Sequence, residues 1–120
     1  MKTHKDLDVW KESTDMVINI YLLSRKFPKE ELFCLTQQLR RAAISIPSNI
    51  SEGAARNQKR EFIRFLRISI GSLSEVETQL LIAEKLGYIF EKELLKMSGQ
   101  IIKIRAQLSG LIKCLEKKIN

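Results

Sequence analysis

The stretch LLKMSGQIIKIRAQLSGLIKCL, residues 94–115, decides the fold class of this 120-residue chain. Its apolar residues recur at alternating intervals of three and four, at Leu94, Met97, Ile101, Ile104, Leu108, Leu111 and Leu115. Such a row, or seam, lies on one side of an α-helix and is typical of helices that pack lengthwise against other helices. The pattern predicts a long amphipathic helix over the last quarter of the chain.

Three earlier segments repeat this spacing and predict three more helices. Their seams are Val9, Ser13, Met16, Ile20, Leu23 and Phe27; then Leu32, Leu35, Leu39, Ala42, Ile46, Asn49 and Gly53; then Phe62, Leu66, Ser69, Leu73, Val76, Leu80, Ala83 and Gly87. Short connections separate the segments, and the alternation typical of strands is nearly absent. We therefore expect an all-α fold, an up-down-up-down antiparallel four-helix bundle with left-handed packing, as a single domain over residues 1–120.

Pro47 lies inside the second predicted helix, which we expect to begin near residues 28–31 and to end near Gly53. Because Ile46 and Ile50 continue the apolar row, the helix should be kinked at Pro47 and not broken there. Asn49 falls on the seam, where an unpartnered amide would cost about 1–3 kcal/mol, so it must find a hydrogen bond, for instance to the carbonyl that Pro47 frees. We interpret the segment as a structural polar kink that sets helix register or assembly, formed by Ser45, Pro47, Asn49, Glu52 and Gly53. A small-ligand pocket of Ser45, Asn49 and Glu52 is the alternative.

The third predicted helix has more apolar residues than one seam requires. Those off the seam include Ile63, Phe65, Ile68 and Ile70. They indicate either a wide core face, which bundle helices commonly have, or the interface of a homo-oligomer. The residues alone give the two interpretations similar weight. Gly71 and Ser72 in the same helix are interpreted as permitting close helix packing.

The net charge of +7 is concentrated in the middle of the sequence. Residues 37–70 carry seven basic and two acidic groups, whereas residues 1–36 are neutral overall. The basic residues of this part are Arg40, Arg41, Arg56, Lys59, Arg60, Arg64 and Arg67. Arginine predominates, and its planar fork suits bidentate contacts with phosphate, so we hypothesise binding to a nucleic-acid backbone. The alternative is a solvated helix face whose arginines pair with Glu52 and Glu61, and only the bundle geometry decides whether Arg40 and Arg41 join the others.

The residue patterns of common catalytic and metal sites are missing from the sequence. His4 is the single histidine, and no CxxC or Glu-x-x-His motif occurs. Cys34 and Cys114 are too few for a disulfide framework. We therefore predict no enzymatic activity, no metal and no cofactor. No apolar run approaches the roughly 20 residues that cross a bilayer, and no signal peptide precedes the first helix, which favours a cytoplasmic protein without membrane contact.

Three runs of sequence resemble a known protein family. They are DLDVWKES (6–13), IYLLSRKFPKEELFCLTQQLRRAAISIPSNISEG (20–53) and FIRFLRISIGSLSEVETQLLIAEKLGY (62–88), and they are similar to the four-helix-bundle proteins encoded in intervening sequences of bacterial 23S ribosomal RNA genes. Departures are few: Cys34 stands where the family often has glycine, and Gln58 where a Ser or Thr cap is expected before Glu61. The resemblance implies antiparallel bundles that assemble as homopentamers, with a nucleic-acid-binding role and no catalytic residues. A related bundle is the accessory protein of diversity-generating retroelements, which partners a reverse transcriptase and its RNA.

Two functions follow from the residues and the resemblance together. The first is a non-enzymatic homo-oligomer, pentameric if the family assembly holds, that binds RNA or DNA through the arginine-rich residues. The second is a protein-interaction or accessory subunit of a nucleic-acid enzyme such as a reverse transcriptase. In the second case, the surplus apolar residues of the third helix would contact a different protein.

Overall fold

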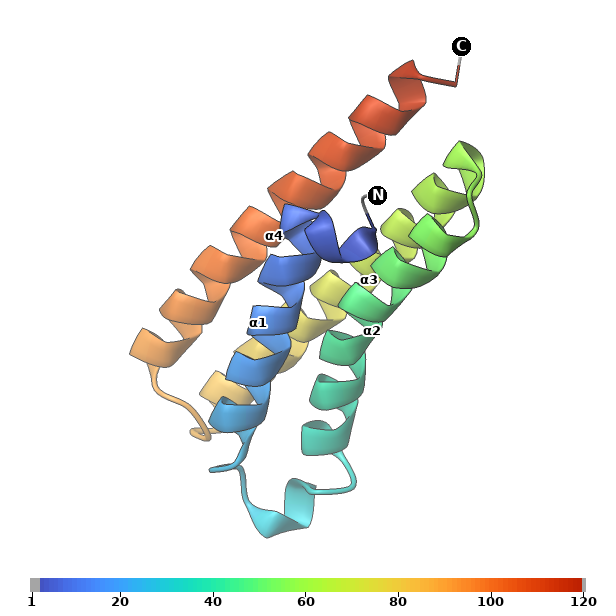
Figure 1. Ribbon diagram of the computed structural model, residues 1–120. Helices are drawn as coiled ribbons and strands as arrows, with labels where there is room; N and C mark the ends of the chain where they lie inside the picture. The colour runs from blue at the N-terminus through green and yellow to red at the C-terminus, as the bar shows by residue number, and fades with distance from the viewer. Residues whose placement is uncertain (1–2, 120) are drawn as a thin grey trace.

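The computed structural model describes residues 3–119, apart from the side chain of Asp6, and in that part of the chain it contains four long helices and no strand. The helices are α1 (Asp8–Ser24), α2 (Leu35–Ala55), α3 (Lys59–Lys85) and α4 (Glu91–Lys117), with short 3₁₀ helices η1 (His4–Asp6) and η2 (Lys29–Glu31). Successive helices run in opposite directions (Figure 1). The predicted four-helix bundle is confirmed.

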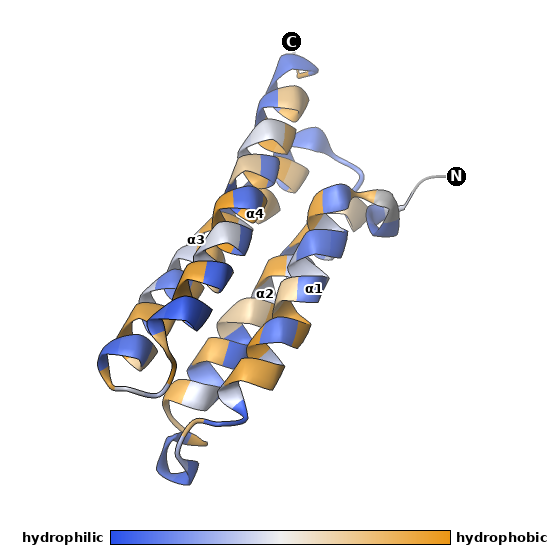
Figure 2. Ribbon diagram, turned by 90° about the vertical axis from the view of Figure 1, so that its left-hand side faces the viewer, coloured by the Kyte–Doolittle hydropathy of each residue, from blue (hydrophilic) through white to orange (hydrophobic). Residues whose placement is uncertain are grey.

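The predicted seams form the core of the bundle. Leu66, Leu73 and Leu80 of α3 are fully buried, as are Ile104 and Leu108 of α4. Figure 2 shows hydrophobic and hydrophilic residues interspersed along each helix. Burying each such side chain stabilises the fold by about 1.5–3 kcal/mol. The alternation of three and four residues therefore located the core correctly.

The contacts between neighbouring helices differ in extent. The contact between α2 and α3 is the most extensive, and that between α1 and α4 is the least. α1 has 17 residues, whereas α3 and α4 have 27 each. As a result, the last turns of α4 extend past the start of α1 (Figure 1). The end of the bundle that holds the α2–α3 turn and the C-terminus is built from three long helices, not four.

α2 begins later and ends later than predicted. η2 is a separate turn, and the backbone at Cys34 (φ −124°, ψ −106°) is not helical, so α2 begins at Leu35 and not near residues 28–31. Leu32, expected on the seam, is 48% exposed. α2 then runs without a break through Pro47 to Ala55. The kink at Pro47 and the left-handed packing stay predictions.

The polar residues near Pro47 connect α2 to α3. The Asn49 amide donates to the carbonyl (2.8 Å) and the hydroxyl (2.9 Å) of Ser45, so its partner is Ser45 and not the carbonyl that Pro47 frees. The Ser45 hydroxyl lies 2.8 Å from the Ser72 hydroxyl of α3, and Ser69 donates to the Ile46 carbonyl at 2.9 Å. The Ser45–Ser72 and Ser69–Ile46 bonds cross between the helices and oppose sliding of α2 along α3, which supports a register role for Ser45, whereas the Asn49 bonds stay within α2.

Ser45 borders a hollow that neither Asn49 nor Glu52 lines. The hollow beside Ser45 is bordered by Gln38, Arg41, Ala42, Ser72, Glu75 and Gln79, and by neither Asn49 nor Glu52. Glu52 is exposed and pairs with Arg56 instead. The alternative of a small-ligand pocket formed by these three residues is therefore not supported.

Gly53 lies inside α2 and does not end it. It is buried, and a Cβ added there would lie 2.8 Å from Phe65 Cβ and 3.0 Å from Phe62 Cδ1. The glycine therefore lets two phenylalanines of α3 approach the α2 backbone. Gly71 has no atom within 4 Å of such a Cβ, so its predicted role in close packing is wrong, whereas Ser72 beside it is buried and contacts Ser45 of α2.

The apolar residues off the α3 seam are mostly covered by the chain itself. Ile63 and Phe65 are each 8% exposed, Ile70 is half-buried against the core, and Ile68 is 40% exposed. The wide core face is thus confirmed for Ile63 and Ile70. Because Ile63 and Phe65 are buried within the chain, the four residues do not form one exposed surface.

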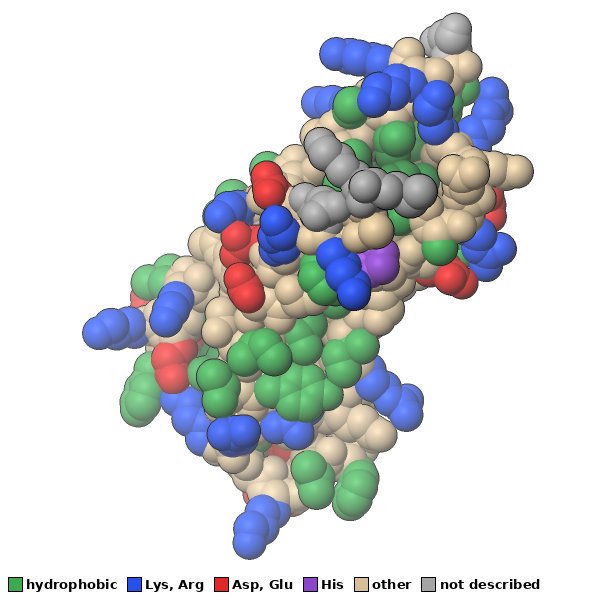
Figure 3. Space-filling view, in the orientation of Figure 1, with side chains coloured by type: hydrophobic (Ala, Val, Ile, Leu, Met, Phe, Trp, Pro, Cys, Tyr) green, Lys and Arg blue, Asp and Glu red, His purple; other side chains and the backbone are tan. Residues whose placement is uncertain are grey.

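A different exposed apolar surface lies over α1 and α2, and we call it the α1–α2 apolar face. Two shallow hollows of about 320 and 350 Å³ meet there at Ile44. Figure 3 shows hydrophobic side chains gathered over these two helices. Its exposed or half-buried residues are Val17, Ile18, Tyr21, Leu32, Phe33 and Ile44, and the buried Pro47 lines one of the hollows. Among the described residues, no helix is both long enough and apolar enough to cross a membrane.

Candidate nucleic-acid interface

One end of the bundle carries most of the positive charge, and we call it the basic end. It comprises the end of α2, the α2–α3 turn, the start of α3 and the last turns of α4. Residues 52–67 and 113–118 hold eight Lys or Arg and three Glu, which leaves +5 of the net +7. Lys and Arg side chains gather at this end in Figure 3. The charge is therefore a local feature of the surface.

The outward face of α3 presents Arg60, Arg64 and Arg67. Their spacing of four and three residues places them on the side of the helix opposite the buried Leu66 and Leu73. All three are exposed, and the side chains of Arg64 and Arg67 keep 55% and 60% of their surface in water. This part of the predicted patch is brought together as expected.

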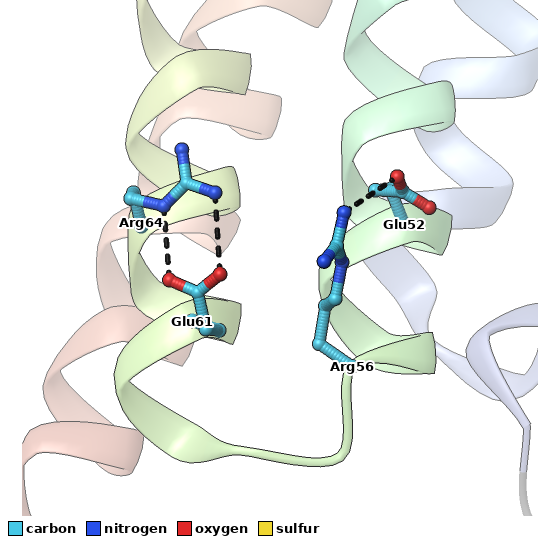
Figure 4. Close-up of polar contacts among 4 residues, drawn as sticks. All are labelled: Glu52, Arg56, Glu61 and Arg64. Carbon is cyan, nitrogen blue, oxygen red and sulfur yellow. Dashed lines mark hydrogen bonds and ion pairs between the residues drawn. The ribbon is translucent and has the colours of Figure 1, made fainter.

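Carboxylates hold three of the arginines at the basic end in ion pairs. Arg64 donates two hydrogen bonds to the Glu61 carboxylate (3.0 and 3.2 Å), and Arg56 pairs with Glu52 at 3.1 Å (Figure 4). Arg67 reaches across to Glu116 of α4 at 3.2 Å. These are the pairs of the solvated-face alternative, with Glu116 added. Because every partner keeps at least 33% of its side chain exposed, water and salt screen the attraction and leave the pairs exchangeable.

The Arg64–Glu61 pair shifts the pKa of both groups. The hydrogen bonds from Arg64 hold the pKa of the Glu61 carboxyl below its usual value, and Glu61 raises the pKa of Arg64 in turn. Both side chains therefore stay charged at neutral pH. The guanidinium is already oriented for a planar anion, since a phosphate accepts the same two parallel hydrogen bonds as a carboxylate.

Phe65 supports two of these arginines from below. The guanidinium carbon of Arg64 lies 4.5 Å from the centre of its ring, and that of Arg56 lies 5.3 Å from it. Such contacts attract a cation to the face of an aromatic ring. Side chains from the α2–α3 turn and from α3 are thus held together over one ring. Sequence reasoning assigned Phe65 to an oligomer interface and missed this role.

Arg40 and Arg41 lie far from the basic end. Arg40 donates to the Ser24 hydroxyl (2.9 Å) and the Tyr21 carbonyl (3.4 Å), and it lies 4.6 Å from the centre of the Tyr21 ring. It therefore joins α2 to α1. Sixteen residues separate Arg40 from Arg56, which is about 24 Å along a helix. Arg41 lines the hollow with Glu75 and Gln79 of α3, so the predicted seven-residue patch divides into two separate groups.

An open hollow of about 790 Å³ lies at the basic end, between the α2–α3 turn and the end of α4. Its lining residues are Gly53, Ala54, Asn57, Gln58, Lys59, Arg60, Phe62, Lys118 and Ile119. Asn57 adopts a left-handed backbone (φ +56°), which reverses the chain between the helices. Gln58 occupies the cap position of α3 without a side-chain cap, so amide groups of the first turn remain available to an anion.

The hollow is formed by residues that lie far apart in the sequence, so the sequence alone did not predict it. Lys59 donates to the Lys118 carbonyl at 3.4 Å, across 59 positions of sequence. The one sequence feature that pointed to this hollow was the group of lysines at 113, 117 and 118.

Among the described residues, no group of three His, Cys, Asp or Glu side chains is placed to hold a metal ion.

Comparisons with known proteins agree with this architecture. Residues 5–110 match the family described as 23S rRNA-intervening sequence protein. The chain is also similar to the crystal structure of a protein of unknown function from the S23 ribosomal protein family of Bacteroides thetaiotaomicron, with 24% identity and a TM-score of 0.79. That match covers 88% of this chain and 98% of the other, and at this identity it shows the fold alone. No curated protein matches the sequence.

Proposed function

The chain belongs to the 23S rRNA-intervening sequence protein family, and from that premise we propose that it is a cytoplasmic, non-enzymatic homo-oligomer that binds the backbone of RNA or DNA through its basic end. The observation that carries the proposal is the concentration of +5 of the net +7 charge at one end of the bundle. Exposed arginines there offer planar, bidentate donors that match phosphate.

The spacing of the exposed arginines suits a polynucleotide. Arg60 and Arg67 are seven residues apart, about 10 Å along the α3 axis. One strand of a duplex rises about 3.4 Å per nucleotide, so this row matches the length of about three nucleotides. Since contacts of this kind address phosphates and not base edges, they predict affinity without sequence preference.

The ion pairs at the basic end do not oppose this function. A phosphate takes the place of the Glu61 or Glu116 carboxylate on the same guanidinium, and the displaced carboxylate returns to water. The Glu61 and Glu116 side chains keep 33% and 51% of their surface in water, so the exchange leaves no charge buried and unpaired. Phe65 keeps Arg64 in place during the exchange.

Binding should weaken steeply as salt is added. Three to five phosphate contacts give a slope of log affinity against log salt of about −2 to −4.5, because each contact releases condensed counterions. Affinity for a labelled RNA or DNA oligonucleotide should therefore fall by about 20- to 500-fold between 50 and 200 mM salt, measured by fluorescence anisotropy. Oligonucleotides of different sequence and equal length should bind alike. Absence of binding at 50 mM salt, or affinity that ignores salt, would contradict the proposal.

Self-association is supported by the α1–α2 apolar face. Ile18, Ile44 and Phe33 are 60%, 42% and 80% exposed there, and a contiguous apolar surface of this kind on a small domain marks an interaction site. We propose that copies of the chain cover this face, with the pentamer of the family resemblance as the assembly. The same surface would serve a different protein if the chain is an accessory subunit of a nucleic-acid enzyme.

Ile44→Glu should separate these alternatives, because Ile44 borders both hollows of the apolar face. The wild-type chain should have a solution mass of about five times 13.9 kDa, and the variant should approach the mass of one chain while keeping its helical circular dichroism. Ile102→Glu is the matched control, since Ile102 is 65% exposed on α4 and lies outside this face. A monomeric wild-type chain would contradict self-association and favour the accessory role.

A further inference from the structure

The hollow at the basic end combines an apolar floor with a cationic rim. We propose that it holds an unpaired nucleotide of a single-stranded nucleic acid, whose base stacks on Phe62 and whose phosphates contact Lys59, Arg60 and Lys118. This inference rests on the proposed nucleic-acid function and goes beyond it, because it assigns a site for a base in addition to the backbone contacts of the α3 arginines.

The floor of the hollow is built by the close approach of α3 to α2. Gly53 lacks a side chain at the point where the Phe62 ring passes, and a Cβ there would lie 3.0 Å from Phe62 Cδ1. The ring is half-buried: it packs against the core cluster and also lines the hollow. Ala54 and Ile119 add to this apolar lining. An aromatic ring in an open hollow offers a stacking surface to any base, since every base has a π-face.

The rim of the hollow selects an anionic occupant. Lys59, Arg60 and Lys118 all line it, and the lining includes no Asp or Glu. Arg60 makes no ion pair with any described residue, unlike Arg56, Arg64 and Arg67. The occupant must therefore have a flat apolar part and adjacent negative charge. A nucleotide joins both in one residue, as a base with its flanking phosphates.

The nucleotide must be unpaired to enter. In a duplex the base faces are stacked on their neighbours, and reaching one requires flipping it out of the helix at a cost in free energy. A single strand already exposes its bases to aromatic side chains. The hollow is open to solvent because α1 begins at Asp8 and does not extend along this end, so a strand has access from the side.

Phe62→Leu tests the site because it removes the aromatic ring and keeps an apolar side chain against the core. At 0.1 M salt, its affinity for a 12-nucleotide single strand should fall by about five- to 150-fold, the range that base–aromatic stacking supports. Its affinity for the same sequence as a duplex should change by less than about twofold, since phosphate contacts are intact. Phe62→Tyr retains a ring and should bind like the wild type. Phe90→Leu is the matched control, because Phe90 is 74% exposed just before α4, at the other end of the bundle.

A fluorescence measurement keeps the test independent of any loss of stability. Trp10 is the single tryptophan, so Phe62→Trp in a Trp10→Phe background places one reporter in the hollow. Single strands should quench its emission, and the duplex should not. Equal losses of single-strand and duplex affinity in Phe62→Leu, or no loss and no quenching, would overturn the stacking site and leave the proposed function standing. A wild-type chain that binds neither form would overturn both.

Discussion

Replacing Arg60, Arg64 and Arg67 together with glutamine should lower the affinity for RNA or DNA by about 100- to 500-fold at 0.1 M salt. Each arginine that contacts a phosphate contributes about 0.7 to 0.9 to the salt slope, so the slope should also become shallower by about two to three units. Glutamine matches arginine closely in helix propensity, and all three positions are exposed, so α3 should remain folded. Fluorescence anisotropy at several salt concentrations measures both quantities.

The matched control removes three positive charges from the opposite end. Arg25, Lys29 and Lys85 are exposed and make no ion pair with any described residue. The bundle is 49 Å long, several times the screening length of about 10 Å at 0.1 M salt, so their replacement with glutamine should reduce affinity by less than about tenfold. Similar losses in the two variants would mean that the protein binds through its overall charge and not through the basic end.

The core was predictable from sequence because helical periodicity is a local property. Residues three and four apart share a helix face whatever the rest of the chain does, so the seams identified Leu66, Leu73 and Leu108 as core residues. The width of the buried face was not predictable in the same way. Ile63 and Phe65 flank the seam, and their burial depends on which helices stand on either side of α3.

The candidate site was only partly predictable because it joins distant segments. The spacing of Arg60, Arg64 and Arg67 placed them on one face correctly. Nothing local shows that Arg40 turns toward Tyr21 of α1, or that Lys118 of α4 meets Lys59 of α3. Those contacts follow from helix lengths and from the end of the bundle at which each helix stops.

Gly53→Ala should destabilise the protein by about 1–2 kcal/mol, although alanine is normally the better helix residue. The added Cβ would meet Phe65 Cβ at 2.8 Å and the Phe62 carbonyl oxygen at 3.3 Å, and neither is the flexible end of a side chain. Overpacking of this kind costs about 1–3 kcal/mol, and the gain in helix propensity offsets at most about 1 kcal/mol of it. Chemical denaturation at pH 7 measures the free energy of unfolding.

The same substitution at Gly99 or Gly110 should have the opposite sign. Both glycines lie within α4, both are exposed, and neither has an atom within 4 Å of an added Cβ. Each replacement by alanine should therefore stabilise the protein by about 0.5–1 kcal/mol through helix propensity alone. A stabilising Gly53→Ala would contradict the prediction and show that α3 moves away from α2 without loss of stability.

Because Phe62 lies against Gly53 and also lines the hollow, a destabilising Gly53→Ala that shifts this ring should weaken single-strand binding more than duplex binding. The packing of α2 on α3 and the shape of the hollow at the basic end thus depend on the same missing side chain.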